Sequence, residues 1–152
     1  MIIRDMNQFE IMQVLENTTV GRLACVHDSE PYIVPLNFIC HLGWLYSFTT
    51  FGRKIKYMRA NPKVCVEFDN IIANNDWQSV IVMGQYQELA GDPGHIDARN
   101  EAYALLSKKA DWWEPAYVKT IIRDHERAVQ PIYFRILITE KTGHKALKSD
   151  PN

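Results

Sequence analysis

The residues with the clearest potential for chemistry lie between Thr49 and Lys54. Two hydroxyls, on Thr49 and Thr50, precede Gly52, and two adjacent cations, Arg53 and Lys54, follow it. From Arg53 onward the apolar side chains recur at helical spacing, which predicts a helix that begins at this pair. A helix N-terminus presents unpaired N–H groups and positive partial charge, where acidic residues are normally favoured. A bound anion would balance the added cations, so this stretch is a candidate phosphate site.

An alternative interpretation is that Arg53 and Lys54 simply point into solvent. This stretch alone favours neither the phosphate site nor the solvent-exposed pair.

Other catalytic residue types are scattered along the chain. The five histidines have no spacing that would place two of them on a metal, and no metal site is expected. Cys25 could pair with a histidine, but a lone buried thiol is more often a packing residue. Because the sequence shows no catalytic residues of its own, we expect the protein to use a bound cofactor. The phosphate site would then bind the phosphate of that cofactor.

Several strands and helices are needed to position this site. The stretch from Trp44 to Thr50 has the aromatic and β-branched residues of a strand, and the helix that follows ends at Asn61-Pro62. Gly84 predicts a bulge or a close backbone approach within a long strand. The remaining predicted strands are Val20–His27, Tyr32–Cys40, Val64–Asp69, Trp77–Leu89 and Ile132–Ile138.

Two further helices are predicted, one before the first strand and one between the last two strands. An N-terminal helix within residues 1–18 begins with a capping box formed by Asn7 and Glu10, and a second helix spans about 92–108. Residues 140–152 are predicted to be a polar tail. No repeat or linker divides residues 1–152, so the sequence predicts one mainly β domain, a closed or split barrel of about six antiparallel strands with inserted helices.

Composition narrows the possible partners. The net charge is -1 and the only adjacent lysines outside the 53–54 region are Lys108-Lys109, which argues against nucleic acid. The N-terminal residues carry charge where a secretory signal is apolar, and no apolar run is long enough to span a membrane. The three cysteines are odd in number and lack CxxC spacing, so they are expected to be reduced. A cytoplasmic protein is therefore expected.

Several blocks of the sequence together resemble a known family. They are GRLACV, PYIVPLNF, WLYSFTTFGRKIKYMRANPKVCVEFD, WQSVIVMGQYQEL and YFRILITEKTGHK. In this order they resemble the pyridoxamine 5′-phosphate oxidase-like superfamily of FMN-binding split barrels, and within it the branch of nitroimidazole-resistance proteins. The likeness runs over roughly residues 19–143 and is weakest between Leu89 and Pro131. It implies a six-stranded antiparallel split β-barrel with Greek-key connections.

The resemblance also implies a cofactor site. Arg53 and Lys54 would bind the FMN phosphate beside Gly52, Thr49 and Thr50, in agreement with the charge argument. The strand at Val34, Pro35, Leu36 and Asn37 would run along the isoalloxazine. Ser79 would reach the flavin from the partner subunit, which implies a homodimer with flavin sites at its interface. Trp77 would cover the ring or, as an alternative of at least equal weight, anchor the start of a barrel strand.

The sequence departs from the resembled branch at Phe48. The branch typically carries a histidine at this position, near the reactive face of the flavin, whereas phenylalanine cannot transfer a proton. Phe48 would lie either in the flavin pocket or in the barrel core, since strand alternation allows both. No catalytic residue can therefore be assigned. The chain also lacks the C-terminal tryptophan and arginine blocks of a true pyridoxamine-phosphate oxidase.

Two function classes follow from the resemblance. The first is an FMN-dependent oxidoreductase that accepts hydride from NAD(P)H and passes electrons to a small aromatic or nitro-aromatic acceptor. The second is a flavin- or haem-binding protein without turnover, used in storage or sensing, for which His144 in the predicted tail is the obvious axial ligand.

Overall fold

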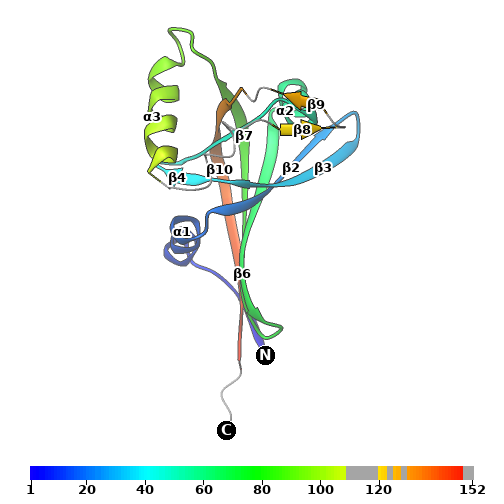
Figure 1. Ribbon diagram of the computed structural model, residues 1–152. Helices are drawn as coiled ribbons and strands as arrows, with labels where there is room; N and C mark the ends of the chain where they lie inside the picture. The colour runs from blue at the N-terminus through cyan, green and yellow to red at the C-terminus, as the bar shows by residue number, and fades with distance from the viewer. Residues whose placement is uncertain (109–119, 123–124, 128–129, 149–152) are drawn as a thin grey trace.

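An antiparallel sheet of eight strands forms the frame of the molecule, and three helices lie against it in the described part of the chain (Figure 1). The computed structural model describes residues 1–108, 120–122, 125–127 and 130–148. The strands of this sheet are β1 (Ile2–Asp5), β2 (Val20–His27), β3 (Glu30–Asn37), β4 (Ile39–His41), β5 (Trp44–Thr49), β6 (Lys63–Ala73), β7 (Asp76–Leu89) and β10 (Ile132–Leu147). The helices are α1 (Gln8–Asn17), α2 (Arg53–Ala60) and α3 (Ile96–Ser107). A separate pair consists of β8 (Thr120–Ile122) and β9 (His125–Arg127).

The strand order brings distant segments together. The order is β3-β2-β6-β7-β10-β5-β4, with β1 paired to β10. At the far ends of this path, β3 contacts β5, and the Ser47 hydroxyl donates to the Asn37 carbonyl oxygen at 2.6 Å. Helix α2 packs on β2, where the Asn61 amide donates to the Val26 carbonyl oxygen at 3.2 Å. The sheet therefore curls into the split barrel that the sequence predicts.

The barrel interior is filled by side chains that alternate along the strands. Val64, Val66 and Phe68 of β6 point inward and are at most 4% exposed, whereas the residues between them are partly exposed. A second apolar cluster joins the other face of β5 to α3; its buried members are Tyr46, Phe48, Leu89, Ala102, Leu106 and Tyr133. Helix α3 thus covers one side of the barrel wall (Figure 1).

Gly84 marks the close backbone approach that the sequence predicts. A Cβ atom at this position would lie 2.4 Å from the Leu137 carbonyl oxygen and 2.5 Å from a methyl carbon of Ile136. Both neighbours belong to β10, which pairs with β7 along most of its length. Glycine is therefore required where the two longest strands cross most closely.

Most predicted elements are confirmed, but β6 extends four residues beyond its predicted end at Asp69, the pair β8–β9 was not predicted, and three further elements differ. The predicted run Tyr32–Cys40 divides at the buried Phe38 into β3 and β4, because β4 turns to pair with β5. Strand β1 was not predicted, and it brings the sheet to eight strands. The predicted polar tail over 140–152 is wrong up to Leu147, because β10 continues between β7 and β1.

None of the helices in the described ranges is long and apolar enough to cross a membrane.

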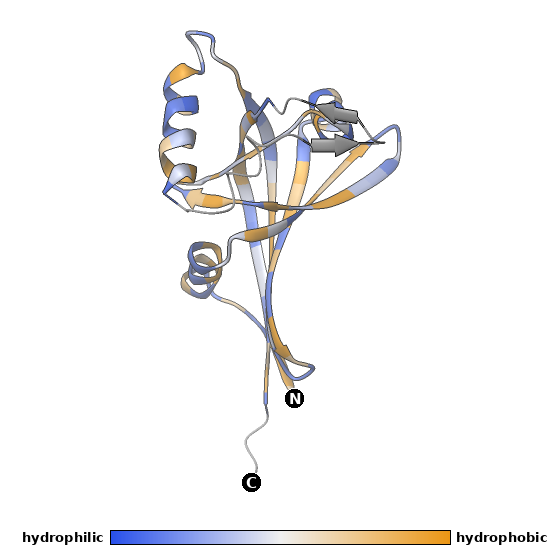
Figure 2. Ribbon diagram, in the orientation of Figure 1, coloured by the Kyte–Doolittle hydropathy of each residue, from blue (hydrophilic) through white to orange (hydrophobic). Residues whose placement is uncertain are grey.

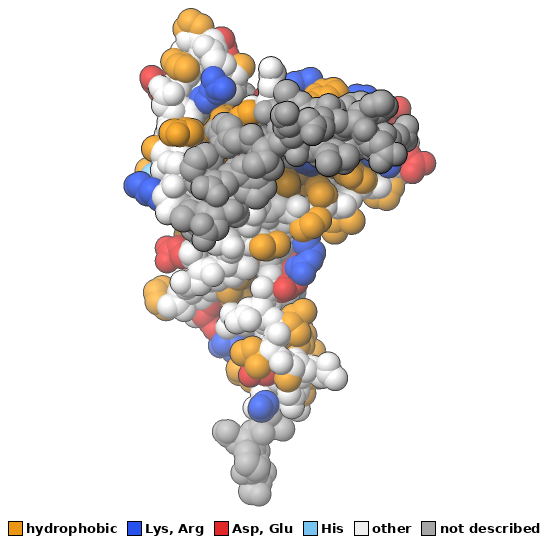
Figure 3. Space-filling view, viewed as in Figure 1, with side chains coloured by type: hydrophobic (Ala, Val, Ile, Leu, Met, Phe, Trp, Pro, Cys, Tyr) orange, Lys and Arg blue, Asp and Glu red, His pale blue; other side chains and the backbone are white. Residues whose placement is uncertain are grey.

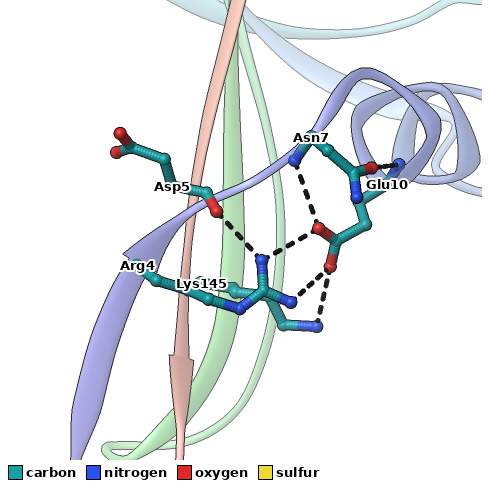
Figure 4. A network of polar contacts seen from close by, with 5 residues as sticks. All are labelled: Arg4, Asp5, Asn7, Glu10 and Lys145. Carbon is teal, nitrogen blue, oxygen red and sulfur yellow. Dashed lines mark hydrogen bonds and ion pairs between the residues drawn. The ribbon is translucent and has the colours of Figure 1, made fainter.

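A polar network fixes β1 and α1 to the end of β10 (Figure 4). The carboxylate of Glu10 accepts two hydrogen bonds from the Arg4 guanidinium, both at 2.9 Å, and one from Lys145 at 3.2 Å. It also accepts the Asn7 backbone N–H, while the Asn7 side chain accepts the Glu10 N–H, so the predicted capping box is confirmed. The hydrogen bonds from Arg4 are the main cause that lowers the pKa of Glu10 to about 2.

Glu10→Gln is expected to destabilise the protein at neutral pH but not near pH 2. The folded-state pKa of Glu10 is depressed, so the ionised carboxylate stabilises the fold above the unfolded pKa of about 4.5. This contribution is lost as the pH falls through about 2. Urea midpoints at pH 7 and pH 2 measure it, with Glu16→Gln on the same helix as control. Equal losses at both pH values would contradict an electrostatic role.

Candidate functional site

The residues that the sequence predicts to bind phosphate lie together at the junction of β5 and α2. Gly52 is the N-cap of α2 and provides no side-chain hydrogen bond, so the first-turn N–H groups have no side-chain cap. The first turn contains no acidic residue. Thr49 is buried at the end of β5, and Thr50 is half-buried beside it. The helix begins at Arg53 and ends at Ala60, as the sequence predicts. Its apolar side chains Ile55 and Met58 are fully buried against the barrel and hold the helix in place.

Lys54 is a half-buried cation at this helix end. Burial is the first cause that lowers the pKa of its ammonium group, and the nearby Cys25 thiol acts in the opposite direction. No salt bridge or hydrogen bond joins Lys54 to any other described residue. A cation that loses hydration without gaining an anion is unfavourable. The site therefore fits a phosphate, which would supply the missing charge.

Arg53 lies over the ring of Tyr32, which was not among the predicted site residues. Its guanidinium carbon is 5.4 Å from the centre of the Tyr32 ring, which contacts the Tyr57 ring edge-on at 6.0 Å. The His27 ring lies 5.6 Å from the Tyr57 ring. These rings hold Arg53 near β3, although its side chain remains exposed. The signal in the sequence was the alternation Tyr32, Val34, Leu36, which places Tyr32 on the inner face of β3.

Strand β3 brings the predicted isoalloxazine-binding residues to an open sheet edge. Val34, Pro35, Leu36 and Asn37 pair with β2 on one side, and no described strand pairs with their other side. Val34 and Leu36 pack against the core, whereas Pro35 faces outward. The open edge offers backbone polar groups without partner strands. A flat ring with polar edges can bind along such an edge.

The structure does not bring Trp77 and Ser79 to this group within one chain. Both lie near the start of β7, beside the β6–β7 hairpin tip, which is at the opposite end of the molecule from α2 (Figure 1). Ser79 pairs with Asp69 on β6 and with His144 on β10, and Trp77 pairs with Ile71 and Ala146. A site that contains both Lys54 and Ser79 thus needs a second copy of the chain.

Phe48 occupies the core beneath α3. It is 7% exposed, and its ring lies 5.8 Å from that of Tyr133. Its neighbour Ser47 points to the opposite side of β5, toward Asn37. Of the two predicted positions for Phe48, the single chain therefore favours the core.

His144 does not lie in a tail as predicted. It is part of β10, and its Nε2 is 3.1 Å from a carboxylate oxygen of Asp5. Trp112 and Trp113, for which the sequence suggested no role, lie outside the described residues.

The comparisons with known proteins agree with this architecture. The family model for pyridoxamine 5′-phosphate oxidase matches residues 7–145. An uncharacterized protein of Rhizobium meliloti is 38% identical over 96% of this chain and 97% of its own length. The solved structure of an FAD-binding protein from Mesorhizobium loti is 40% identical, has a TM-score of 0.77 and covers 96% of this chain and 99% of its own.

The narrower resemblance receives less support. The structure of a candidate 5-nitroimidazole antibiotic resistance protein from Bacteroides thetaiotaomicron is 16% identical, with a TM-score of 0.68, and covers 95% of this chain and 89% of its own. At this identity the likeness concerns the fold alone. The sequence of the Mesorhizobium protein is much more similar, so the comparisons support the family and not the nitroimidazole-resistance branch in particular.

Proposed function

The chain belongs to the pyridoxamine 5′-phosphate oxidase family, and on this basis we propose that it binds a flavin by its phosphate at the N-terminus of α2. The main support for this proposal is the environment of Lys54. This side chain is half-buried, lacks an anionic partner among the described residues and lies at a helix end without a side-chain cap. Arg53 adds a second cation that the Tyr32 ring holds in place. The open edge of β3 provides backbone groups for the flavin ring.

The flavin we propose is FMN. One phosphate suits the single helix N-terminus and its two cations. The name of the Mesorhizobium protein supports FAD as a second candidate, since its identity to this chain is 40%. The pyrophosphate of FAD carries the same type of charge to the same residues, so both candidates rely on Arg53 and Lys54.

The reaction we propose is electron transfer from NAD(P)H to a small aromatic or nitro-aromatic acceptor. A bound flavin supplies hydride chemistry that the chain's own side chains lack. The residues of this chain would hold the phosphate, orient the ring along β3 and exclude water from one side. The free thiols of Cys25, Cys40 and Cys65 are compatible with the reducing cytoplasm, where we propose that the protein acts.

The proposal includes a homodimer with flavin sites between the subunits. The start of β7, which carries Trp77 and Ser79, lies at the opposite end of the molecule from α2, which carries Lys54. A two-fold partner could bring these residues to the same ligand. A ligand on the open edge of β3 would have one side uncovered in a single chain. A partner would cover that side in both sites at once.

The purified protein is therefore expected to show flavin absorbance, with FMN rather than FAD released on denaturation. Chromatography of the released flavin separates these two cofactors. NADH or NADPH should bleach the absorbance without oxygen, and an added nitro-aromatic acceptor should restore it. Protein that neither carries nor takes up a flavin would refute the proposal, and a flavin that no nicotinamide reduces would favour the non-catalytic alternative.

A further inference from the structure

Phe51 is an exposed aromatic residue beside the candidate flavin site. It lies between Thr50 and Gly52 in the sequence, directly before the N-cap of α2. It is 56% exposed and belongs to neither of the two described apolar clusters. Phe51 therefore presents an aromatic surface to solvent next to the residues that would bind the flavin phosphate.

A series of contacts that leads to β7 fixes the position of this ring. The guanidinium carbon of Arg59 lies 5.4 Å from the centre of the Phe51 ring. Arg59 donates two hydrogen bonds to the Glu88 carboxylate, at 2.8 and 3.1 Å, and the Tyr86 hydroxyl donates to the same carboxylate at 2.7 Å. A bidentate pair of arginine and carboxylate has a defined geometry. The ring is thus held by a cation that other residues position, so a flat ligand could stack on it with little ordering cost.

Helix α2 carries more positive charge than one flavin phosphate requires. Its sequence, RKIKYMRA, contains four cations and no acidic residue, and Figure 2 shows the helix as mostly hydrophilic. Arg53 and Lys54 would bind the flavin phosphate, and Arg59 is paired with Glu88. Lys56 is the cation that remains, because it forms no salt bridge with any residue in the described ranges. A second anionic group could therefore bind at this helix.

The unpaired cation and the exposed ring lie together. The Lys56 ammonium is 5.6 Å from the centre of the Phe51 ring, and both residues are exposed. At the upper edge of the molecule, near α2, basic and hydrophobic side chains lie side by side (Figure 3). Proteins bind nucleotides with such pairs of groups, because a base stacks on the aromatic ring and the cation pairs with a phosphate.

We propose that Phe51 and Lys56 form a subsite for an adenosine 5′-phosphate group, whose adenine stacks on Phe51 and whose phosphate pairs with Lys56. The inference rests on the proposed flavin site and extends it along α2. Two ligands of the proposed function contain this group, namely the NAD(P)H donor and FAD, the second flavin candidate. FMN lacks it. The same chemistry thus has two sources, which the experiments below distinguish.

Calorimetric titration of the FMN-loaded protein with AMP tests the subsite directly, since FMN occupies Arg53 and Lys54. Phe51→Ala is expected to weaken AMP binding about tenfold, because the adenine loses its stacking partner. Phe51→Trp keeps an aromatic face and should retain AMP binding. Inorganic phosphate, which has no base, should bind the wild type and both variants equally. The matched control Phe9→Ala removes a 70% exposed phenylalanine from α1 and should bind AMP like the wild type.

Two further measurements identify the source of the group. If the source is FAD, Phe51→Ala should raise the dissociation constant of FAD about tenfold and leave that of FMN within about twofold. If the source is the donor, the variant should raise the apparent dissociation constant of NADH about tenfold in anaerobic reduction of the bound FMN. Reduced nicotinamide mononucleotide, which lacks the adenosine, should then reduce the variant and the wild type alike.

Three outcomes would overturn the inference. The first is FMN-loaded wild-type protein that does not bind AMP, and the second is AMP binding that Phe51→Ala leaves unchanged. The third is an equal loss of FMN and FAD affinity in Phe51→Ala, which would show that the ring only supports the start of α2. Protein that binds no flavin would refute the proposed function, whereas AMP binding that depends on Phe51 would still support this subsite.

Discussion

Replacing Lys54 with methionine is expected to weaken FMN binding about 10–100-fold, which corresponds to the loss of one charge-assisted hydrogen bond worth about 1.5–3 kcal/mol. Methionine keeps the length and apolar stem of lysine but removes the charge. Among the described residues, the half-buried site would then retain the helix N-terminus and Arg53 as positive groups for the phosphate. Riboflavin, which has no phosphate, should bind the variant and the wild type almost equally.

A lysine on the same helix provides the matched control. Lys56 is exposed, and its ammonium lies 5.6 Å from the centre of the Phe51 ring. Lys56→Met should leave FMN affinity within about twofold, because the charge of an exposed side chain is screened by solvent. Fluorescence quenching on titration with each flavin measures all three proteins. A folded Arg53→Met, Lys54→Met variant with unchanged FMN affinity would refute this site assignment.

Phe48→His is expected to destabilise the protein by about 2–4 kcal/mol, the usual cost of burying a poorly satisfied polar ring. Phe48 is 7% exposed and packs between Tyr133 and the underside of α3. An imidazole there loses ring packing and lacks water for its nitrogen atoms. The flavin spectrum and turnover should show no new titration between about pH 6 and 8, where an exposed imidazole would titrate.

Denaturant unfolding and a pH series of the flavin spectrum separate the two positions considered for Phe48. Phe48→Leu serves as the control, because it removes ring packing without adding a polar group. If the histidine variant stays as stable as this control and its flavin signal titrates near neutral pH, then position 48 faces the flavin in the assembled protein. The core interpretation would then fail.

Local signals predicted the limits of α2 well. The helix is preceded by Gly52 and followed by Asn61-Pro62, which are typical start and stop signals. Its observed limits, Arg53 and Ala60, therefore follow from the sequence. The cations of Arg53 and Lys54 are adjacent in sequence, so one helix turn suffices to bring them together. The contact between Tyr32 and Tyr57 was not predicted, because it joins a strand and a helix and the two residues are 25 positions apart in the sequence.

Features that depend on distant partners were harder to predict. Strand β1 contains four residues, all exposed, and becomes a strand only because β10 lies beside it. The sequence at the end of β10 is typical of a polar tail. In the structure, however, Lys145 donates a hydrogen bond to Glu10, which lies near the other end of the sequence. The positions of Trp77 and Ser79 relative to a flavin depend on a second chain, and one sequence carries no pattern for that arrangement.

The position of β10 has a consequence for how the protein folds during synthesis. This strand lies between β5 and β7 in the sheet and also pairs with β1, so each of these earlier strands lacks a neighbour until residues 132–147 have left the ribosome. Contacts between segments so far apart in sequence are slow to form. Until then, the edges of β5 and β7 are open to pairing with other chains. Nascent chains shorter than about 130 residues should therefore depend on chaperones to avoid aggregation.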